Sequence, residues 1–110
     1  MNANVYQTMA MQTAGELPEL SDKLAAAALG LCGEAGEFAD HVKKYFYHGH
    51  DLDNARVRKE LGDILWYAAL ACEALETRLG DVMEENIIKL RERYPEGFSW
   101  AASVDRPTTG

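Results

Sequence analysis

Residues 24 to 47 read LAAAALGLCGEAGEFADHVKKYFY, and this stretch decides the fold. Alanine, leucine, glutamate and lysine dominate it, and these residues lose little conformational freedom in a helix. Large apolar residues recur at every seventh position, at Leu24, Leu31, Phe38 and Tyr45. This spacing predicts one long amphipathic helix that begins between Glu19 and Asp22 and ends near Tyr47.

The sequence on either side of this helix predicts three more helices. A loop over His48–Asp51 leads into a second long helix over about residues 53–78, and Gly80 is a suitable stop for it. Shorter helices are predicted over about residues 4–13 and 81–94. No stretch shows the period-two alternation of a strand. We therefore expect an all-α protein, a four-helix bundle.

Length and composition limit what such a bundle can be. With 110 residues and 47% hydrophobic residues, we expect one globular domain over residues 1–110, with a tail over 99–110. The second long helix is apolar beyond a single stripe, at Trp66 and Leu70 among others. Four helices of this kind are too few to enclose a core alone. We expect a homodimer, or a tetramer built as a dimer of dimers, in which two chains complete the bundle.

The charge and the cysteines exclude several classes of function. A net charge of −7 argues against binding to nucleic acid or to anionic membranes. No signal peptide pattern is present, and no run reaches the roughly 18 apolar residues of a membrane span. Cys32 and Cys72 show no zinc-binding spacing, so we interpret both as reduced thiols in the core of a cytoplasmic protein.

Two acidic pairs carry the candidate chemistry. Glu34 and Glu37 share one face of the first long helix, and Glu60 and Asp63 share one face of the second. Each pair lies about 12 residues from the centre of the loop, so an antiparallel hairpin would bring both to one level. Four carboxylates there would repel unless a hard divalent cation bound among them, and oxygen ligands favour Mg²⁺ or Mn²⁺. The alternative is that each pair is solvated or pairs with nearby lysines.

Four glycines interrupt the two long helices beside these carboxylates. They are Gly30, Gly33, Gly36 and Gly62. Each costs a helix about 1 kcal/mol relative to alanine. The cluster indicates that backbone or ligand approaches closely at this level. Close helix–helix packing without a ligand would explain it equally well.

Polar and cationic residues continue the same faces. His41 and Lys44 follow Glu37 on its stripe, and Lys44 is well placed to neutralise a phosphate. In the last predicted helix a second polar stripe is formed by Asn86, Lys89 and Arg93. Cationic and amide groups facing an acidic metal site would suit a polyphosphate. Taken alone, each of these residues could equally be solvated or packed.

These motifs together resemble a known family. The matching stretches are Gly33–Glu37, Lys43–Lys44, Glu60–Tyr67 and Asn86–Phe98. Over about residues 24–98, the ExxE motif followed by ExxD resembles the MazG-type nucleoside triphosphate pyrophosphohydrolase family. The interior glycines and the Trp-Tyr dipeptide after the second acidic pair match as well, and Tyr6-Gln7 resembles small, single-domain members.

The resemblance implies Mg²⁺-dependent hydrolysis of nucleoside or deoxynucleoside triphosphates to the monophosphate and pyrophosphate, for house-cleaning or control of the nucleotide pool. It implies that the catalytic and metal-binding residues are Glu34, Glu37, Glu60 and Asp63. It implies that the phosphate-binding residues are Lys44, Asn86, Lys89 and Arg93. It implies nucleotide contacts from Gln7, Trp66, Tyr67 and Tyr94.

Two other classes of protein are alternatives. A carboxylate metal-binding bundle could serve redox or storage chemistry, but di-iron bundles add histidines in ExxH spacing, which this sequence lacks. A non-catalytic helical dimer could act as an interaction module. That alternative would leave the carboxylates and the interior glycines unexplained.

Overall fold

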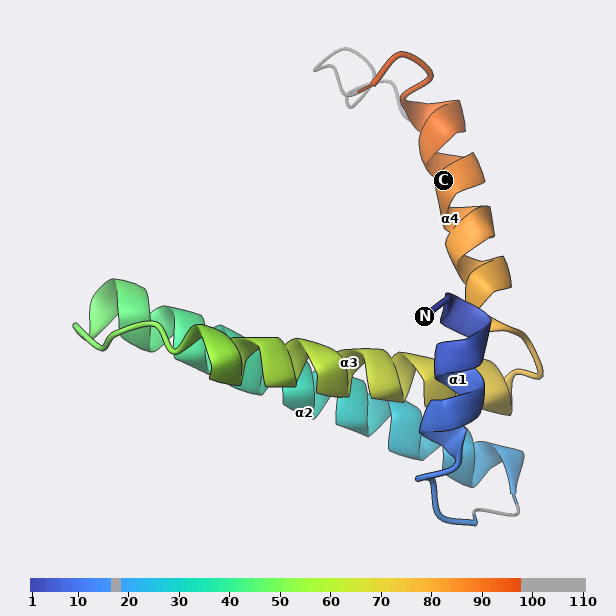
Figure 1. Cartoon of the computed structure of the whole chain (residues 1–110), viewed down its shortest axis with the longest axis horizontal. Coiled ribbons are helices and arrows are strands. Elements are labelled where there is room, and N and C mark those ends of the chain that lie inside the picture. Colours follow the sequence, from blue (N-terminus) through green and yellow to red (C-terminus); the bar gives the residue numbers. More distant parts are fainter. Residues whose placement is uncertain (17–18, 98–110) are drawn as a thin grey trace. The chain divides into compact units, whose positions relative to one another are not determined.

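The computed structural model describes residues 1–16 and 19–97. Within these residues the chain forms helices and no strand, which confirms the all-α class. The helices are α1 (Ala3–Met11), α2 (Leu20–Tyr47), α3 (Asn54–Ala74) and α4 (Leu79–Arg93), shown in Figure 1. The chain forms two compact units, residues 1–79 and residues 80–110. The tail expected over 99–110 lies outside the described residues.

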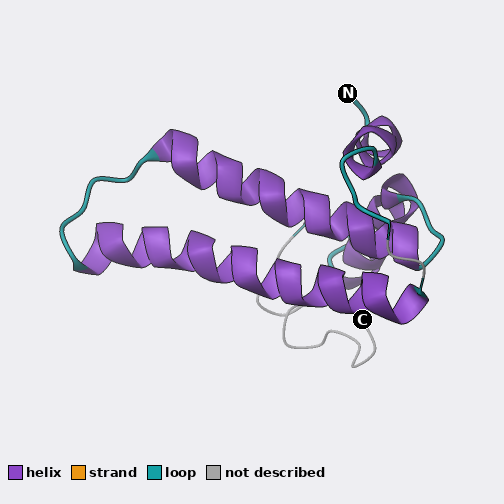
Figure 2. Ribbon diagram, turned by 90° about the horizontal axis from the view of Figure 1, so that it is seen from below, coloured by secondary structure: helices purple, strands orange, loops and turns teal. Residues whose placement is uncertain are grey.

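Helices α2 and α3 form the predicted antiparallel hairpin. They run side by side over most of their length and are joined by the loop after Tyr47 (Figures 1 and 2). Asp53 caps α3, since its carboxylate accepts a hydrogen bond of 3.2 Å from the backbone N–H of Arg56. The hairpin places the acidic stripes of both helices against each other.

Helix α3 ends earlier than the sequence indicates, and Gly80 is not its stop. Glu76 adopts the left-handed conformation, with φ 54°, directly after the C-cap at Leu75. The N–H of Thr77 donates to the carbonyl of Cys72 at 2.9 Å, a helix-closing bond of the Schellman type. Gly80 lies inside α4 instead. The prediction was wrong because a non-glycine residue takes the position that glycine usually fills.

Helix α1 is held on the end of α3 by a buried glutamine. Gln7 is fully buried, and its Nε2 donates to Glu73 Oε2 at 2.9 Å and to the carbonyl of Thr77 at 3.1 Å. Its Oε1 accepts a hydrogen bond of 2.6 Å from the N–H of Leu79. One side chain therefore satisfies polar groups of the turn that follows α3.

A second set of hydrogen bonds holds the other end of α1. The indole N–H of Trp66 is shared between the carbonyl of Ala10 at 3.2 Å and the hydroxyl of Thr13 at 2.8 Å. Helix α1 is thus fixed across α3 at two levels, one at Gln7 and the other at Trp66.

The apolar core formed by the described residues is small. Its buried members there are Ala10, Ala27, Ala69, Leu70, Cys72, Ala74 and Leu79. Large apolar side chains of the hairpin remain exposed, among them Leu29 at 75% and Leu65 at 51%. Cys32 is also exposed, which corrects its expected place in the core, whereas Cys72 is buried as expected. None of the described helices has the length and apolarity needed to cross a bilayer.

Candidate metal and phosphate site

Three of the four predicted carboxylates converge between α2 and α3. Glu34 and Glu37 come from consecutive turns of α2, and Glu60 faces them from α3. One carboxylate oxygen from each residue lies within 4.8 Å of the other two. Glu37 is exposed, whereas the side chain of Glu60 is only 13% exposed. The group therefore has a buried side and an open side.

Asp63 lies outside this three-carboxylate group but close enough to affect it. Its charge is among the causes that raise the pKa of Glu34, and with burial it raises the pKa of Tyr6 on α1. In this arrangement Glu60 belongs to the group, whereas Asp63, on the next turn of α3, is exposed and outside it.

The crowding of like charges appears in the pKa of Glu34. A hydrogen bond shared with Glu60 raises it to about 7, with further contributions from burial and from the charges of Glu37, Asp63 and Glu60. The Oε2 atoms of Glu34 and Glu60 are closed to solvent and have no hydrogen-bond donor among the described residues. Buried oxygens without a donor are costly for a protein.

These features fit a hard divalent cation. The atoms that would bind the metal are all carboxylate oxygens. Mg²⁺ and Mn²⁺ prefer such ligands, and zinc is less well suited to them. A cation among them would supply the missing partner of the two buried Oε2 atoms and would offset the repulsion at Glu34. The residues present therefore match the cofactor expected from the sequence.

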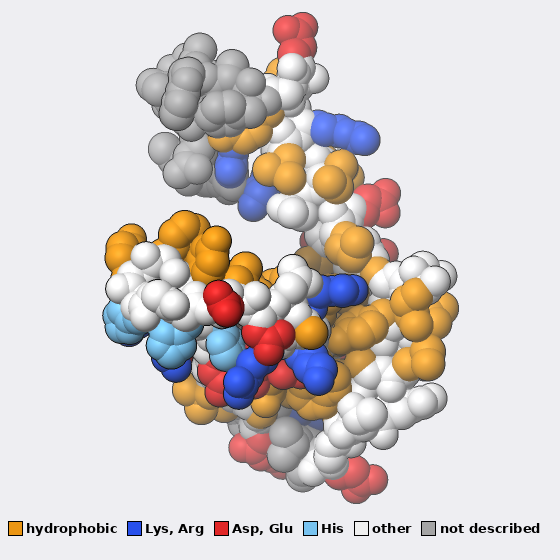
Figure 3. Space-filling view, turned by 60° about the vertical axis from the view of Figure 1, so that its left-hand side comes forward, with side chains coloured by type: hydrophobic (Ala, Val, Ile, Leu, Met, Phe, Trp, Pro, Cys, Tyr) orange, Lys and Arg blue, Asp and Glu red, His pale blue; other side chains and the backbone are white. Residues whose placement is uncertain are grey.

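An open pocket of about 490 Å³ adjoins the three-carboxylate group. Its described lining consists of Gly33, Gly36, Glu37, Asp40, His41, Lys44, Arg56 and Glu60. Figure 3 shows acidic, basic and histidine side chains gathered on this part of the hairpin. A Cβ atom at Gly33 or Gly36 would meet nothing within 4 Å, so the absence of side chains at these positions leaves open space on the α2 side of the pocket.

The interior glycines thus divide into two kinds. Only Gly30 meets another element, because a Cβ there would collide with the ring of Tyr67 on α3. Gly62, like Gly33 and Gly36, has open space around it. Close helix packing explains Gly30, and it does not explain the other three.

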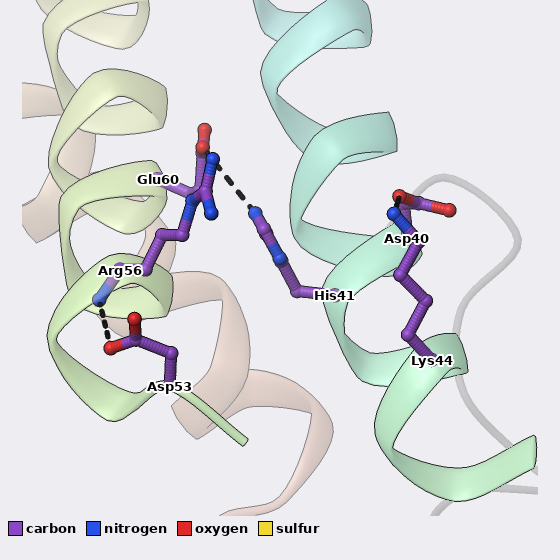
Figure 4. Close-up of polar contacts among 6 residues, drawn as sticks. All are labelled: Asp40, His41, Lys44, Asp53, Arg56 and Glu60. Carbon is purple, nitrogen blue, oxygen red and sulfur yellow. Dashed lines mark hydrogen bonds and ion pairs between the residues drawn. The ribbon is translucent and has the colours of Figure 1, made fainter. Parts of the chain in front are cut away.

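Two cations are among the described residues that line the pocket, and sequence reasoning missed one of them. Lys44 forms an ion pair of 2.9 Å with Asp40, whereas Lys43 points to a more exposed position, 3.9 Å from Asp40. Arg56 extends along α3 from the opposite side (Figure 4). Its spacing of four residues before Glu60 was the available signal, because i and i+4 share a helix face.

Two of the predicted nucleotide contacts are engaged elsewhere. The amide of Gln7 and the indole N–H of Trp66 are both bonded to other parts of the chain. Tyr67 lies against Gly30 and meets the Trp66 ring edge-on, with 5.0 Å between the ring centroids. In this structure, these residues hold α1 and α2 against α3.

The predicted residues of α4 belong to the second unit. Asn86 and Lys89 are exposed and line a hollow of about 420 Å³ with Val82, Met83 and Glu85. Arg93 and Tyr94, at the end of α4, are half-buried. Asn86 and Lys89 therefore lie on one side of α4, as the predicted polar stripe requires. Their phosphate-binding role stays a prediction.

Fold and site together define an all-α protein with a carboxylate site suited to a divalent cation and with cations beside it. The sequence profile of the MazG nucleotide pyrophosphohydrolase domain matches residues 22–98, and the chain belongs to this family. One relative, the Gene 37 protein of Mycobacterium phage L5, is 33% identical over 118 residues, covering 96% of this chain and 100% of the phage protein. No solved structure matches the chain significantly.

Proposed function

We propose that this protein hydrolyses nucleoside or deoxynucleoside triphosphates to the monophosphate and pyrophosphate, with Mg²⁺ or Mn²⁺ as cofactor. The observation that carries the proposal is the pocket in which the three-carboxylate group adjoins Lys44 and Arg56. A chain with a net charge of −7 needs local positive charge to bind a polyphosphate. The pocket combines that charge with oxygen ligands for a metal, and membership of the MazG family supports the reaction.

Glu34, Glu37 and Glu60 are the proposed metal ligands, with Asp63 as a fourth carboxylate beside them. A divalent cation bound there would lower the pKa of a coordinated water and offset charge on the phosphates. One of the carboxylates accepts the proton of the attacking water. The new bond joins the water oxygen to phosphorus, and the P–O bond of the α–β anhydride breaks as pyrophosphate leaves with the electron pair.

Lys44 and Arg56 are proposed to hold oxygens of the leaving pyrophosphate. They line the pocket from opposite helices, so a phosphate bound in it would meet a cation from each helix. Asn86, Lys89 and Arg93 are proposed as further phosphate ligands. Trp66, through its ring and not through its bonded N–H, is proposed to contact the nucleoside together with Tyr67 and Tyr94.

Gln7 is omitted from the proposed nucleotide contacts because both ends of its amide are bonded within the chain. A homodimer or a dimer of dimers is also part of the proposal. The exposed apolar side chains of the hairpin, including Leu29, Leu61 and Leu65, support it. A role in clearing or balancing the nucleotide pool would follow from the activity.

The test is a panel of nucleoside and deoxynucleoside triphosphates incubated with the protein and Mg²⁺, with separate assays for pyrophosphate and orthophosphate. We expect equal amounts of monophosphate and pyrophosphate, and no turnover with EDTA. Glu37→Gln is the matched inactive variant, since this exposed side chain can lose its charge without disturbing the core. Release of orthophosphate in place of pyrophosphate would refute the cleavage site, and no turnover of any nucleotide would refute the activity.

A further inference from the structure

A histidine faces one of the carboxylates across the hairpin. His41 Nε2 on α2 lies 3.8 Å from Glu60 Oε1 on α3, and both side chains are largely buried, at 22% and 13% exposed (Figure 4). Both residues also line the pocket. The two side chains therefore face each other at the wall of the proposed metal site.

The two oxygens of Glu60 have different surroundings. Oε1 faces His41, whereas Oε2 is closed to solvent and has no donor within the described part of the chain. Glu34 Oε2, in the same group, is closed to solvent and lacks a donor in the same way. One oxygen of Glu60 thus faces a protein group, and the other has no partner among the described residues.

We propose that His41 is a positioning residue for Glu60: its imidazole, 3.8 Å from Oε1, restrains the carboxylate so that Oε2 faces the cation site. This inference rests on the proposed function, because it concerns the same site. A glutamate side chain has several rotatable bonds, and restraining one oxygen from the opposite helix reduces the freedom lost when a metal binds. Residues that orient ligating carboxylates in this way affect metal affinity strongly.

The other nearby cations are less suited to this task. Lys44 is paired with Asp40 on its own helix, and Arg56 extends from the same helix as Glu60. Both carry a permanent positive charge, which would oppose a metal ion close by. An imidazole carries no permanent charge of this kind and presents a ring nitrogen to the carboxylate. His41 is also anchored on the helix opposite Glu60, so the pair spans the hairpin.

The experiment measures Mn²⁺ binding to the full chain by calorimetry, without nucleotide. His41→Ala removes the polar group, His41→Gln keeps an uncharged N–H donor, and His41→Lys keeps N–H donors but adds a permanent positive charge. His48→Ala is the matched control, since this exposed histidine is not among the described residues that line the pocket. We expect Kd to rise about tenfold in His41→Ala, to stay within about threefold of the parent in His41→Gln, and to be unchanged in His48→Ala.

Parent-like Kd in His41→Ala would overturn the inference, and so would tighter binding by His41→Lys than by His41→Gln. Thermal unfolding of the metal-free variants checks the fold; if His41→Ala is unfolded, the comparison of the Gln and Lys variants decides. Absence of Mn²⁺ binding by the parent would also overturn it. If the His41 dependence holds while no nucleotide is hydrolysed, the proposed function fails alone. If hydrolysis proceeds and His41→Ala binds Mn²⁺ as the parent does, only the positioning inference fails.

Discussion

Glu34 on α2 and Glu60 on α3 share a hydrogen bond across the hairpin, and this contact is the main cause that raises the pKa of Glu34 to about 7. The Oε2 atom of each residue is closed to solvent and has no hydrogen-bond partner among the described residues. Folding therefore brings together carboxylates that repel each other at neutral pH. A divalent cation at this point would turn an unfavourable cluster into a set of ligands.

The first prediction concerns pH and the stability of the metal-free protein. The pKa of Glu34 is raised from 4.5 to about 7, so the folded chain binds this proton more tightly than the unfolded chain does. The metal-free protein should therefore lose stability as the pH rises from about 4.5 to about 7, and Mg²⁺ should restore it above that range. Urea unfolding at a series of pH values, with EDTA or with Mg²⁺, measures this.

Glu34→Gln is the control for this prediction. Without the titrating group, the variant should be more stable than the parent above pH 7 in EDTA, and Mg²⁺ should stabilise it less. If the unfolding free energy depends on pH in the same way in parent and variant, the Glu34–Glu60 contact does not govern the pH dependence of stability.

The second prediction concerns the two cations of the pocket. Lys44→Ala and Arg56→Ala should each raise KM for the nucleotide about tenfold or more, because a hydrogen bond between charged groups is lost. Lys43→Ala and Arg58→Ala are matched controls, since both residues are exposed and neither is among the described residues that line the pocket. Steady-state kinetics on all four variants provides the comparison. Equal increases of KM in the pocket variants and in the control variants would mean that the overall charge of the protein, and not this pocket, attracts the substrate.

The third prediction separates the interior glycines. Gly30→Ala should destabilise the protein by about 1–3 kcal/mol, because the new Cβ collides with the Tyr67 ring. Gly62→Ala should stabilise it by up to about 1 kcal/mol, since its Cβ meets open space and alanine favours the helix. Denaturant midpoints of the two variants test this. Similar shifts in the same direction would contradict the assignment of Gly30 as the single close contact among the interior glycines.

The fourth prediction concerns the anchor of α1. Gln7→Ala removes the hydrogen bonds to Glu73, Thr77 and Leu79 and leaves buried polar groups without partners, so it should cost about 2–4 kcal/mol of unfolding free energy. Gln12→Ala, at an exposed position, should change it by less than about 0.5 kcal/mol. Chemical denaturation measures both. Unchanged stability with a raised KM would instead place Gln7 in contact with the nucleotide.

Much of the fold could be predicted because helix signals are local. The seven-residue repeat from Leu24 to Tyr45 predicted α2, and the loop after Tyr47 predicted the hairpin. The end of α3 could not be predicted, because Glu76 adopts the left-handed conformation with no glycine to mark it. Arg56 was missed because its spacing of four residues before Glu60 places both on one helix face but does not show that a pocket lies there until the facing helix is known.

The sequence by itself determined which carboxylates share a helix face, because positions three apart on an α-helix always do. The tertiary structure decided how closely those faces meet. It brought Glu60 against Glu34 and Glu37 and left Asp63 to one side, because the rotation of α3 about its own axis depends on packing against α1 and α2. It also assigned Gln7 and Trp66 to hold α1, through hydrogen bonds between residues more than fifty positions apart. Such contacts form only when the chain folds, and no local pattern encodes them.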